Sequence, residues 1–159
     1  MQPPTTGYRL PSEAEWAYAA RYAGESKARK YPWGNTFPPT GSAGNYADSS
    51  ASTLLPNTLS DYGDGYLVSA PPGSFAPSRA GFFDMGGNVA EWCQDFFAVY
   101  PNAENTVVMD PAGPATGRHH VVRGSSWRNA SISELRLSYR DYSEKARSDL
   151  GFRIARYAD

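Results

Sequence analysis

The sequence predicts one α+β domain that is rich in loops, with a single short helix and a small antiparallel sheet. Its 159 residues include 15 glycines and 13 prolines, which favour turns and irregular backbone. Aromatic side chains make up 14% of the chain, and such large groups can hold irregular segments in place. Helical spacing of apolar residues is confined to one stretch near the N-terminus, whereas strand-like alternation gathers near the C-terminus.

The helix is predicted over residues 12–22. Ser12 and Glu15 have the spacing of a capping box, in which each side chain bonds the backbone N–H of the other residue. Trp16, Ala19 and Ala20 then recur at helical spacing, and the alanines have high helix propensity. The helix should end before Gly24.

Residues 34–82 read mainly as loop, because Gly, Pro, Ser, Asn and Asp occur every few positions. A connection of this length is uncommon in a compact domain, and long loops often carry function or bind an ion. Three strands are predicted beyond it, over His120–Gly124, Leu135–Arg140 and Gly151–Arg156. We expect these three strands to be antiparallel.

Composition excludes several classes of function. The formal net charge of −1 provides no clustered basic surface for nucleic acid. No apolar run approaches the roughly 18 residues of a membrane-spanning helix, so no membrane span is expected in this chain. Cys93 is the only cysteine, so no intrachain disulfide forms. Residues 1–8 are predicted to be a flexible lead-in, and an extracytoplasmic location would require a targeting segment removed upstream.

Four blocks of sequence resemble one known family in order and spacing. They are Gly7–Trp16 (GYRLPSEAEW), Tyr31–Asn35 (YPWGN), Phe83–Cys93 (FDMGGNVAEWC), and Val122–Trp127 (VRGSSW) followed by Leu135–Arg140 and Gly151–Arg153. Together they resemble the formylglycine-generating enzyme, or sulfatase-modifying factor, family. The resemblance implies a fold similar to the C-type lectin fold, with a twisted antiparallel sheet. It also implies that residues 9–159 form the C-terminal portion of the family domain.

The catalytic chemistry of the family depends on a cysteine pair that this sequence lacks. Formylglycine-generating enzymes use two cysteines after the RGGSW block to hold copper(I), a soft ion that prefers thiolates. The corresponding segment, Arg128–Leu135, has no cysteine, so no copper is expected and the chain is predicted to be a pseudoenzyme. A related branch uses three histidines for iron. Here only His119 and His120 occur, and neighbours on a strand point to opposite faces.

Calcium is the metal that the resemblance implies. One family site corresponds to the carboxylates of Asp84 and Glu91 with the carbonyls of Gly87 and Val89, an oxygen set that suits a hard cation. Alternatively, Asp84 only caps a turn and Glu91 pairs with a buried arginine. A second site corresponds to Asn45 and the carbonyls of Tyr46 and Phe75, although the aspartate usual two residues before that phenylalanine is Gly73 here.

The arginines of the C-terminal half are predicted to form a structural network. Buried arginine requires carboxylates or carbonyls as partners. The arginines concerned are Arg123, Arg136, Arg140, Arg147, Arg153 and Arg156, with Glu91, Asp141 and Asp149 as candidate partners.

Three functions are therefore considered. The first is a non-catalytic binding or scaffolding domain of a larger bacterial protein, whose protein or small-ligand partner the sequence does not identify. The second is an oxidoreductase of the family with an altered metal site. The third is a variable ligand-binding protein like those diversified by retroelements, which share this fold. The missing cysteines favour the first function over the second.

Overall fold

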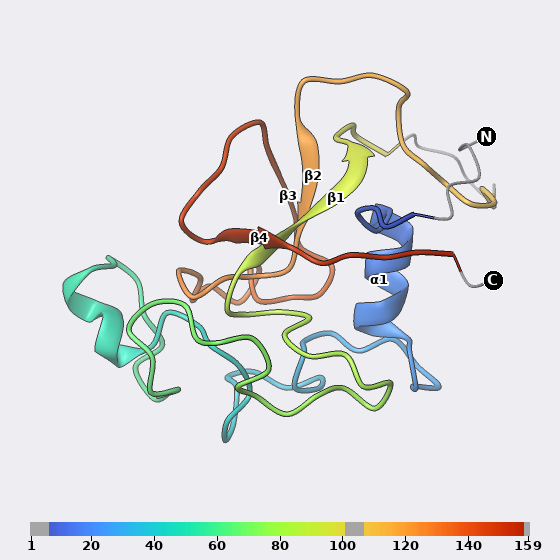
Figure 1. Cartoon of the computed structure of the whole chain (residues 1–159). Coiled ribbons are helices and arrows are strands. Elements are labelled where there is room, and N and C mark those ends of the chain that lie inside the picture. Colours follow the sequence, from blue (N-terminus) through green and yellow to red (C-terminus); the bar gives the residue numbers. More distant parts are fainter. Residues whose placement is uncertain (1–6, 101–106, 158–159) are drawn as a thin grey trace.

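The structure is a computed structural model that describes residues 7–100 and 107–157. Its elements are the helix α1 (Glu13–Arg21), the short 3-10 helix η1 (Ser49–Thr53) and the strands β1 (Ala90–Phe96), β2 (His120–Arg123), β3 (Arg140–Ser143) and β4 (Leu150–Phe152). Figure 1 shows α1 beside the four strands, with most of residues 22–89 forming loops in the lower half of the view.

Parts of two sequence predictions lie outside the described residues. Of the lead-in predicted over residues 1–8, only Gly7 and Tyr8 are described, and both are exposed. The predicted domain span of 9–159 includes residues 101–106 and 158–159, which are likewise outside the description. None of the helices within the described ranges is long and apolar enough to cross a membrane.

The predicted helix and its capping box are confirmed. The Ser12 hydroxyl accepts a hydrogen bond from the Glu15 backbone N–H at 3.2 Å, and the Glu15 carboxylate accepts one from the Ser12 N–H at 2.7 Å. Arg9 holds the same carboxylate through a second pair of contacts at 2.6 and 2.7 Å. Two of the N–H groups left unpaired at the helix start are thereby satisfied, which explains why α1 begins where local sequence predicts.

The sheet is mixed, so the prediction of a wholly antiparallel sheet is wrong. The strand order is β3-β2-β1-β4; the β1–β2 and β2–β3 pairs are antiparallel, but β1 and β4 are parallel. The chain leaves β3 at one edge of the sheet and crosses to the opposite edge before it forms β4. Because of this crossing, β4 runs in the same direction as β1.

The individual strand predictions have different outcomes. The strand predicted over His120–Gly124 is confirmed as β2, and the one over Gly151–Arg156 is confirmed only as far as Phe152. Ala155 lies beyond β4 and forms an isolated bridge with Arg9. The strand predicted over Leu135–Arg140 is wrong, since residues 135–139 form turns and β3 starts only at Arg140.

The alternation that suggested that strand has another cause. Leu135 and Leu137 are both buried, but they enter different clusters of the core. Leu135 packs among the tyrosines Tyr31, Tyr46 and Tyr62, whereas Leu137 packs against Trp16 on α1. A turn that buries two side chains in two clusters produces the same apolar-polar pattern as a half-buried strand.

The core between α1 and the sheet is small and well defined. Its buried members are Trp16, Ala20, Met85, Cys93, Val121 and Leu137. A second cluster, built from three tyrosines with Leu59 and Leu135, holds the long loop region that the sequence predicts over residues 34–82. Packing of aromatic side chains, rather than regular backbone hydrogen bonding, therefore holds most of that region in place.

Candidate functional site

The carboxylate of Glu91 lies near the end of the block from Phe83 to Cys93 that resembles the family. Glu91 is on β1, is only 5% exposed, and points toward α1. Its Oε2 accepts hydrogen bonds from the indole Nε1 of Trp16 and from Nε of Arg153, both at 2.6 Å. Its Oε1 accepts a third from Nη2 of Arg153, also at 2.6 Å. The carboxylate is therefore paired with a cation of the protein itself.

The Arg153 guanidinium also collects backbone oxygens of the same block. Its Nη2 donates to the carbonyls of Phe83 at 3.1 Å and Asp84 at 3.4 Å. The Asp84 carboxylate is turned elsewhere and accepts the Gly73 N–H at 2.7 Å. Arg153 thus lies among oxygens of both carboxylate residues predicted to bind calcium, in the role that a bound cation would have.

The other two residues of that predicted set have contacts of their own. The N–H of Gly87 donates to the carbonyl of Ser125 at 3.0 Å and to its hydroxyl at 3.1 Å. Val89 packs against Gly151, the middle residue of β4. Calcium at Asp84, Gly87, Val89 and Glu91 stays a prediction, which a melting experiment described below tests.

The second predicted ion set includes an unpaired oxygen. Asn45 is fully buried, and its Nδ2 donates to the Val68 carbonyl at 2.7 Å and to Asn88 Oδ1 at 3.3 Å. Its Oδ1 is buried without a hydrogen-bond partner, which is costly unless some group binds it. The neighbouring Tyr46 N–H donates to Asp64 Oδ2 at 2.9 Å. The unpaired amide oxygen of Asn45 lies next to the Tyr46 N–H, which is bound by the Asp64 carboxylate. Oxygen ligands of this kind suit a hard cation.

Asp64 was not among the residues that the sequence predicted for this site. It lies within the long loop predicted over residues 34–82, and the structure brings its carboxylate to the Tyr46 N–H, beside Asn45. Burial raises the pKa of Asp64 above its ordinary value. Its own N–H donates to the carboxylate of the buried Asp48 at 2.8 Å, and neither aspartate has an ion pair with a described residue.

Phe75, the third predicted member, is buried against Tyr66 with a ring-centroid distance of 6.0 Å. Over the described ranges, no three His, Cys, Asp or Glu side chains gather at metal-binding distance. An ion at Asn45 would therefore depend on amide and carbonyl oxygens in addition to one carboxylate. This second calcium site also stays a prediction.

The segment Arg128–Leu135, where the family carries its cysteine pair, is closed by polar contacts. Asn129 Oδ1 accepts the N–H of Ser126 at 2.8 Å and its hydroxyl at 3.0 Å. The backbone carbonyl of Asn129 accepts the Ala47 N–H at 3.1 Å. The Ser126 hydroxyl also donates to Asp149 Oδ2 at 2.9 Å. These groups offer only oxygen and nitrogen ligands, which suit copper(I) poorly.

Cys93 is enclosed in the core between α1 and the sheet. It has no exposed surface, and burial raises the pKa of its thiol far above the ordinary value. A neutral, shielded thiol is neither a nucleophile nor a metal ligand.

We therefore expect Cys93 to resist alkylation in the folded protein. At pH 8, iodoacetamide should modify it at least about 100-fold more slowly in buffer than in 8 M urea, because only unfolding exposes the thiol. Intact-mass spectrometry at successive times measures both rates. Rapid modification in buffer would show that the α1–sheet core opens readily.

The two histidines contact different residues. The His120 ring packs on Phe96 at a centroid distance of 4.3 Å, and its Nδ1 lies 3.1 Å from the Gln94 carbonyl oxygen. The His119 ring instead packs edge-on against Tyr142 at 5.0 Å. Each histidine is part of an aromatic cluster of the sheet, and the two do not converge on one point.

Several arginines form the expected network with carboxylates. Besides Arg153 with Glu91, Arg147 pairs with Asp141 at 2.9 Å and with Asp149 at 3.3 Å. Sequence reasoning missed the partner of Arg140, which is the buried Glu13 at the first position of α1. Arg123 lies 3.6 Å from the same carboxylate and donates to the carbonyls of Leu137 and Tyr139.

A helix beside a small mixed sheet, with long loops held by tyrosines and buried arginines, is the fold of formylglycine-generating-enzyme-like proteins. Among solved structures, Treponema denticola variable protein 1 superposes with a TM-score of 0.72 and 31% sequence identity, over 94% of this chain and 47% of that chain. The chain belongs to the sulfatase-modifying factor enzyme 1-like domain family, whose model matches residues 4–158.

Relatives within the family differ in activity. The formylglycine-generating enzyme of Streptomyces coelicolor is 37% identical over 157 residues, covering 96% of this chain and 48% of the relative. The inactive C-alpha-formylglycine-generating enzyme 2 of Mus musculus is 31% identical, covering 94% of this chain and 43% of the relative. The chain thus spans about half the length of the curated relatives it matches. Family membership alone does not decide whether it is catalytic.

Proposed function

We propose that this chain is a non-catalytic member of the family that serves as a binding or scaffolding module within a larger bacterial protein. The observation that carries the proposal is that the chain has a single, buried thiol in place of the family's cysteine pair. The segment Arg128–Leu135 has no cysteine, and Cys93 is buried with a raised pKa. Copper(I) bound by two thiolates therefore has no ligands in this chain. An inactive relative of similar sequence supports the proposal.

The fold remains suited to binding after loss of catalysis. Buried ion pairs and tyrosine clusters fix long loops that have little regular secondary structure. Loops held rigidly on a scaffold are the usual carriers of recognition, because their side chains can vary without disturbing the core. A binding role accordingly requires no chemistry beyond the described side chains.

The test is an assay for aldehyde formation. We expect no conversion of a sulfatase-motif peptide when the protein is incubated with copper(I) and oxygen, since no thiolate pair holds the metal. Mass spectrometry of the peptide measures the product. A copper-only reaction is the blank, and the Streptomyces coelicolor relative is the positive control.

Turnover above the blank would contradict the proposal and favour the second function, an oxidoreductase with an altered metal site. Substituting Cys93 by serine then distinguishes the routes. Loss of turnover would implicate the buried thiol, and retained turnover would implicate oxygen and nitrogen ligands alone.

A second candidate function is that of a variable ligand-binding protein. The observation that favours it is the similarity to Treponema denticola variable protein 1 over 94% of this chain. Such a function requires substitutions concentrated at exposed positions while the core stays constant. Comparing this gene between isolates distinguishes the two functions, because a variable ligand-binding protein would confine its substitutions to one patch of exposed positions, whereas a fixed scaffold would spread them over the whole exposed surface.

A further inference from the structure

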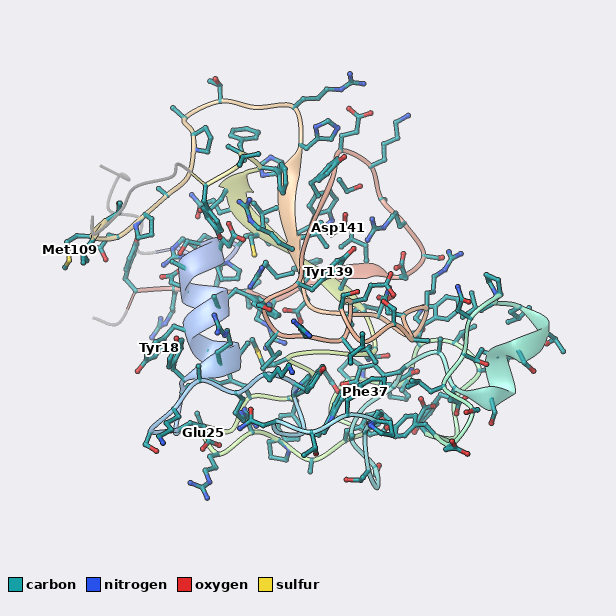
Figure 2. The ribbon with its side chains drawn as sticks, turned by 180° about the vertical axis from the view of Figure 1, so that it is seen from behind. Tyr18, Glu25, Phe37, Met109, Tyr139 and Asp141 are labelled. Atoms are coloured by element: carbon teal, nitrogen blue, oxygen red, sulfur yellow. The ribbon has the colours of Figure 1, made fainter. Side chains whose placement is uncertain are left out.

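A groove lies between α1, the end of β1 and the segment that precedes β2. It has a volume of about 620 Å³, within the range of small-molecule sites. Its lining includes Glu13, Ala17, Asp95, Val99, Tyr100 and Val108. Figure 2 shows Tyr18 on the outward side of α1 and Met109 at the periphery on the same side of the molecule. None of the residues predicted to bind calcium lines this groove.

The apolar part of the groove is open to solvent. Val99, Tyr100 and Val108 are all exposed, with relative accessibilities of 85%, 65% and 61%. Ala17 of α1 and Pro114 complete this side. Exposed aliphatic side chains that line a concavity favour a ligand with a hydrocarbon portion, because burying that portion removes apolar surface from water.

One of the two carboxylates in the groove is already neutralised. Glu13 accepts Nε and Nη2 of Arg140 at 2.6 and 2.8 Å, in a bidentate pair. The Arg140 guanidinium is further fixed between the rings of Phe97 and Tyr100, at 4.5 and 4.1 Å from their centroids. Because Arg123 also lies 3.6 Å from this carboxylate, Glu13 has no negative charge left to offer a ligand.

The other carboxylate, Asp95, lacks a cationic partner. Its Oδ2 accepts the Glu13 backbone N–H at 2.8 Å, and no lysine, arginine or histidine nitrogen of a described residue lies within ion-pair distance. Asp95 is 6% exposed, and burial raises its pKa above the ordinary value. A carboxylate can accept about four hydrogen bonds, so acceptor capacity remains. Among the residues that line the groove, Asp95 is the charged group without an ion-pair partner, since Glu13 and Arg140 bind each other.

We propose that this groove binds an alkylammonium group, as carried by a lysine side chain or a small aliphatic amine. The ammonium lies at Asp95 and donates hydrogen bonds to its carboxylate. The hydrocarbon chain lies along Val99 and Val108. Arg140 is engaged by Glu13 and therefore attracts an anion less than it would if unpaired, and the unpaired Asp95 carboxylate in the groove selects a cation. This inference goes beyond the proposed function and holds whether or not the chain is catalytic.

The test compares a charged probe with a neutral one of the same shape. Butylammonium and 1-butanol are titrated at pH 7 and 150 mM salt, and the backbone amide shifts of Glu13, Asp95 and Gly113 are followed by NMR. We expect butylammonium to bind at least about tenfold more tightly than 1-butanol, as a charge-assisted hydrogen bond provides. Nα-acetyl-lysine methylamide is a third probe. Its binding would assign the ammonium group to a lysine side chain, and its failure to bind would assign it to a free amine.

Asp95→Asn is the central variant. Its amide oxygen still accepts the Glu13 N–H, so α1 keeps its contact while the charge is removed. We expect the preference for butylammonium to fall below about threefold. Asp61→Asn removes the same charge from an exposed loop and is the matched control, which should keep the preference. Ala112→Trp, at an exposed position of the lining, should weaken all probes by filling the groove.

Equal binding of butylammonium and 1-butanol to the wild-type protein would overturn the proposal, as would the absence of binding by both. A preference retained in Asp95→Asn, or lost equally in Asp61→Asn, would also overturn it, because the effect would then be one of net charge. Should Asp95→Asn fail to fold, Ala112→Trp decides: undiminished binding of butylammonium to that variant places the amine elsewhere and ends the proposal.

Discussion

Glu91→Gln is expected to lower the free energy of unfolding by about 3 kcal/mol, because Arg153, whose side chain is 24% exposed, loses the counter-charge of its partly buried ion pair. Glu91 is 5% exposed, and its side chain accepts three hydrogen bonds from Trp16 and Arg153. The substituted amide can accept only at one atom, and its NH₂ group would face the guanidinium. The melting temperature should fall by about 6–12 °C for a domain of this size. Thermal and urea denaturation measure both quantities.

Glu144→Gln is the matched control for that substitution. Glu144 also pairs with an arginine at 2.6 Å, but its partner Arg118 is 76% exposed. An exposed pair contributes little, so this variant should stay within about 0.5 kcal/mol of the wild-type protein. Equal effects of the two substitutions would contradict the structural role assigned to Glu91.

The wild-type protein and Glu91→Gln together test the predicted calcium site. Calcium at ~100 times its dissociation constant would add about 2.7 kcal/mol to the stability of a protein that binds it only when folded. If Glu91 is a ligand, calcium raises the wild-type melting temperature, a chelator lowers it, and Glu91→Gln abolishes the difference. If Glu91 serves only Arg153, Glu91→Gln is destabilised equally with calcium and with chelator. Elemental analysis of the chelated protein excludes a trapped ion.

The helix could be predicted from sequence because its signals are local. The capping box of Ser12 and Glu15 lies within four residues, and the structure forms both of its hydrogen bonds. Strand β1, in contrast, was not predicted. Its residues facing α1 are Glu91, Cys93 and Asp95, two of them charged, so the sequence lacks the apolar alternation of an ordinary half-buried strand. Only the tertiary partners of those carboxylates make their burial favourable.

The calcium sites stay predictions from the family resemblance, and the contacts that the structure shows around them could not be assigned from local sequence. Arg153 lies 62 residues from Glu91, and no local pattern identifies the pair among the other arginines and carboxylates. Asp64 lies 18 residues from Tyr46 in an irregular region, where an aspartate is expected for turn geometry alone. Contacts across such distances depend on how the loops pack on the tyrosine cluster, which hydrophobic periodicity does not encode.

Gly87→Ala is expected to destabilise the protein strongly, because the added methyl group meets both an unfavourable backbone conformation and fixed neighbours. Gly87 has a φ of 89°, which costs an L-residue about 1–2 kcal/mol. A Cβ there would also lie 2.8 Å from the Asn45 carbonyl oxygen and 2.8 Å from the Tyr46 ring. Neither group can yield readily, since that carbonyl accepts the Asn88 N–H and both residues are fully buried. Overpacking adds about 1–3 kcal/mol, so we expect a total loss of about 2–5 kcal/mol.

Gly65→Ala separates the two causes of that loss. Gly65 has nearly the same φ, 88°, but a Cβ there would meet no atom within 4 Å. The free energy of unfolding of this variant should fall only by the cost of the positive φ, about 1–2 kcal/mol, because no neighbour must move to admit the methyl group. Urea denaturation of the two variants under identical conditions measures the difference. Closely similar midpoints would mean that the Asn45–Tyr46 backbone yields to Gly87, and that the packing of the Asp84–Glu91 block onto the long loop is looser than these distances indicate.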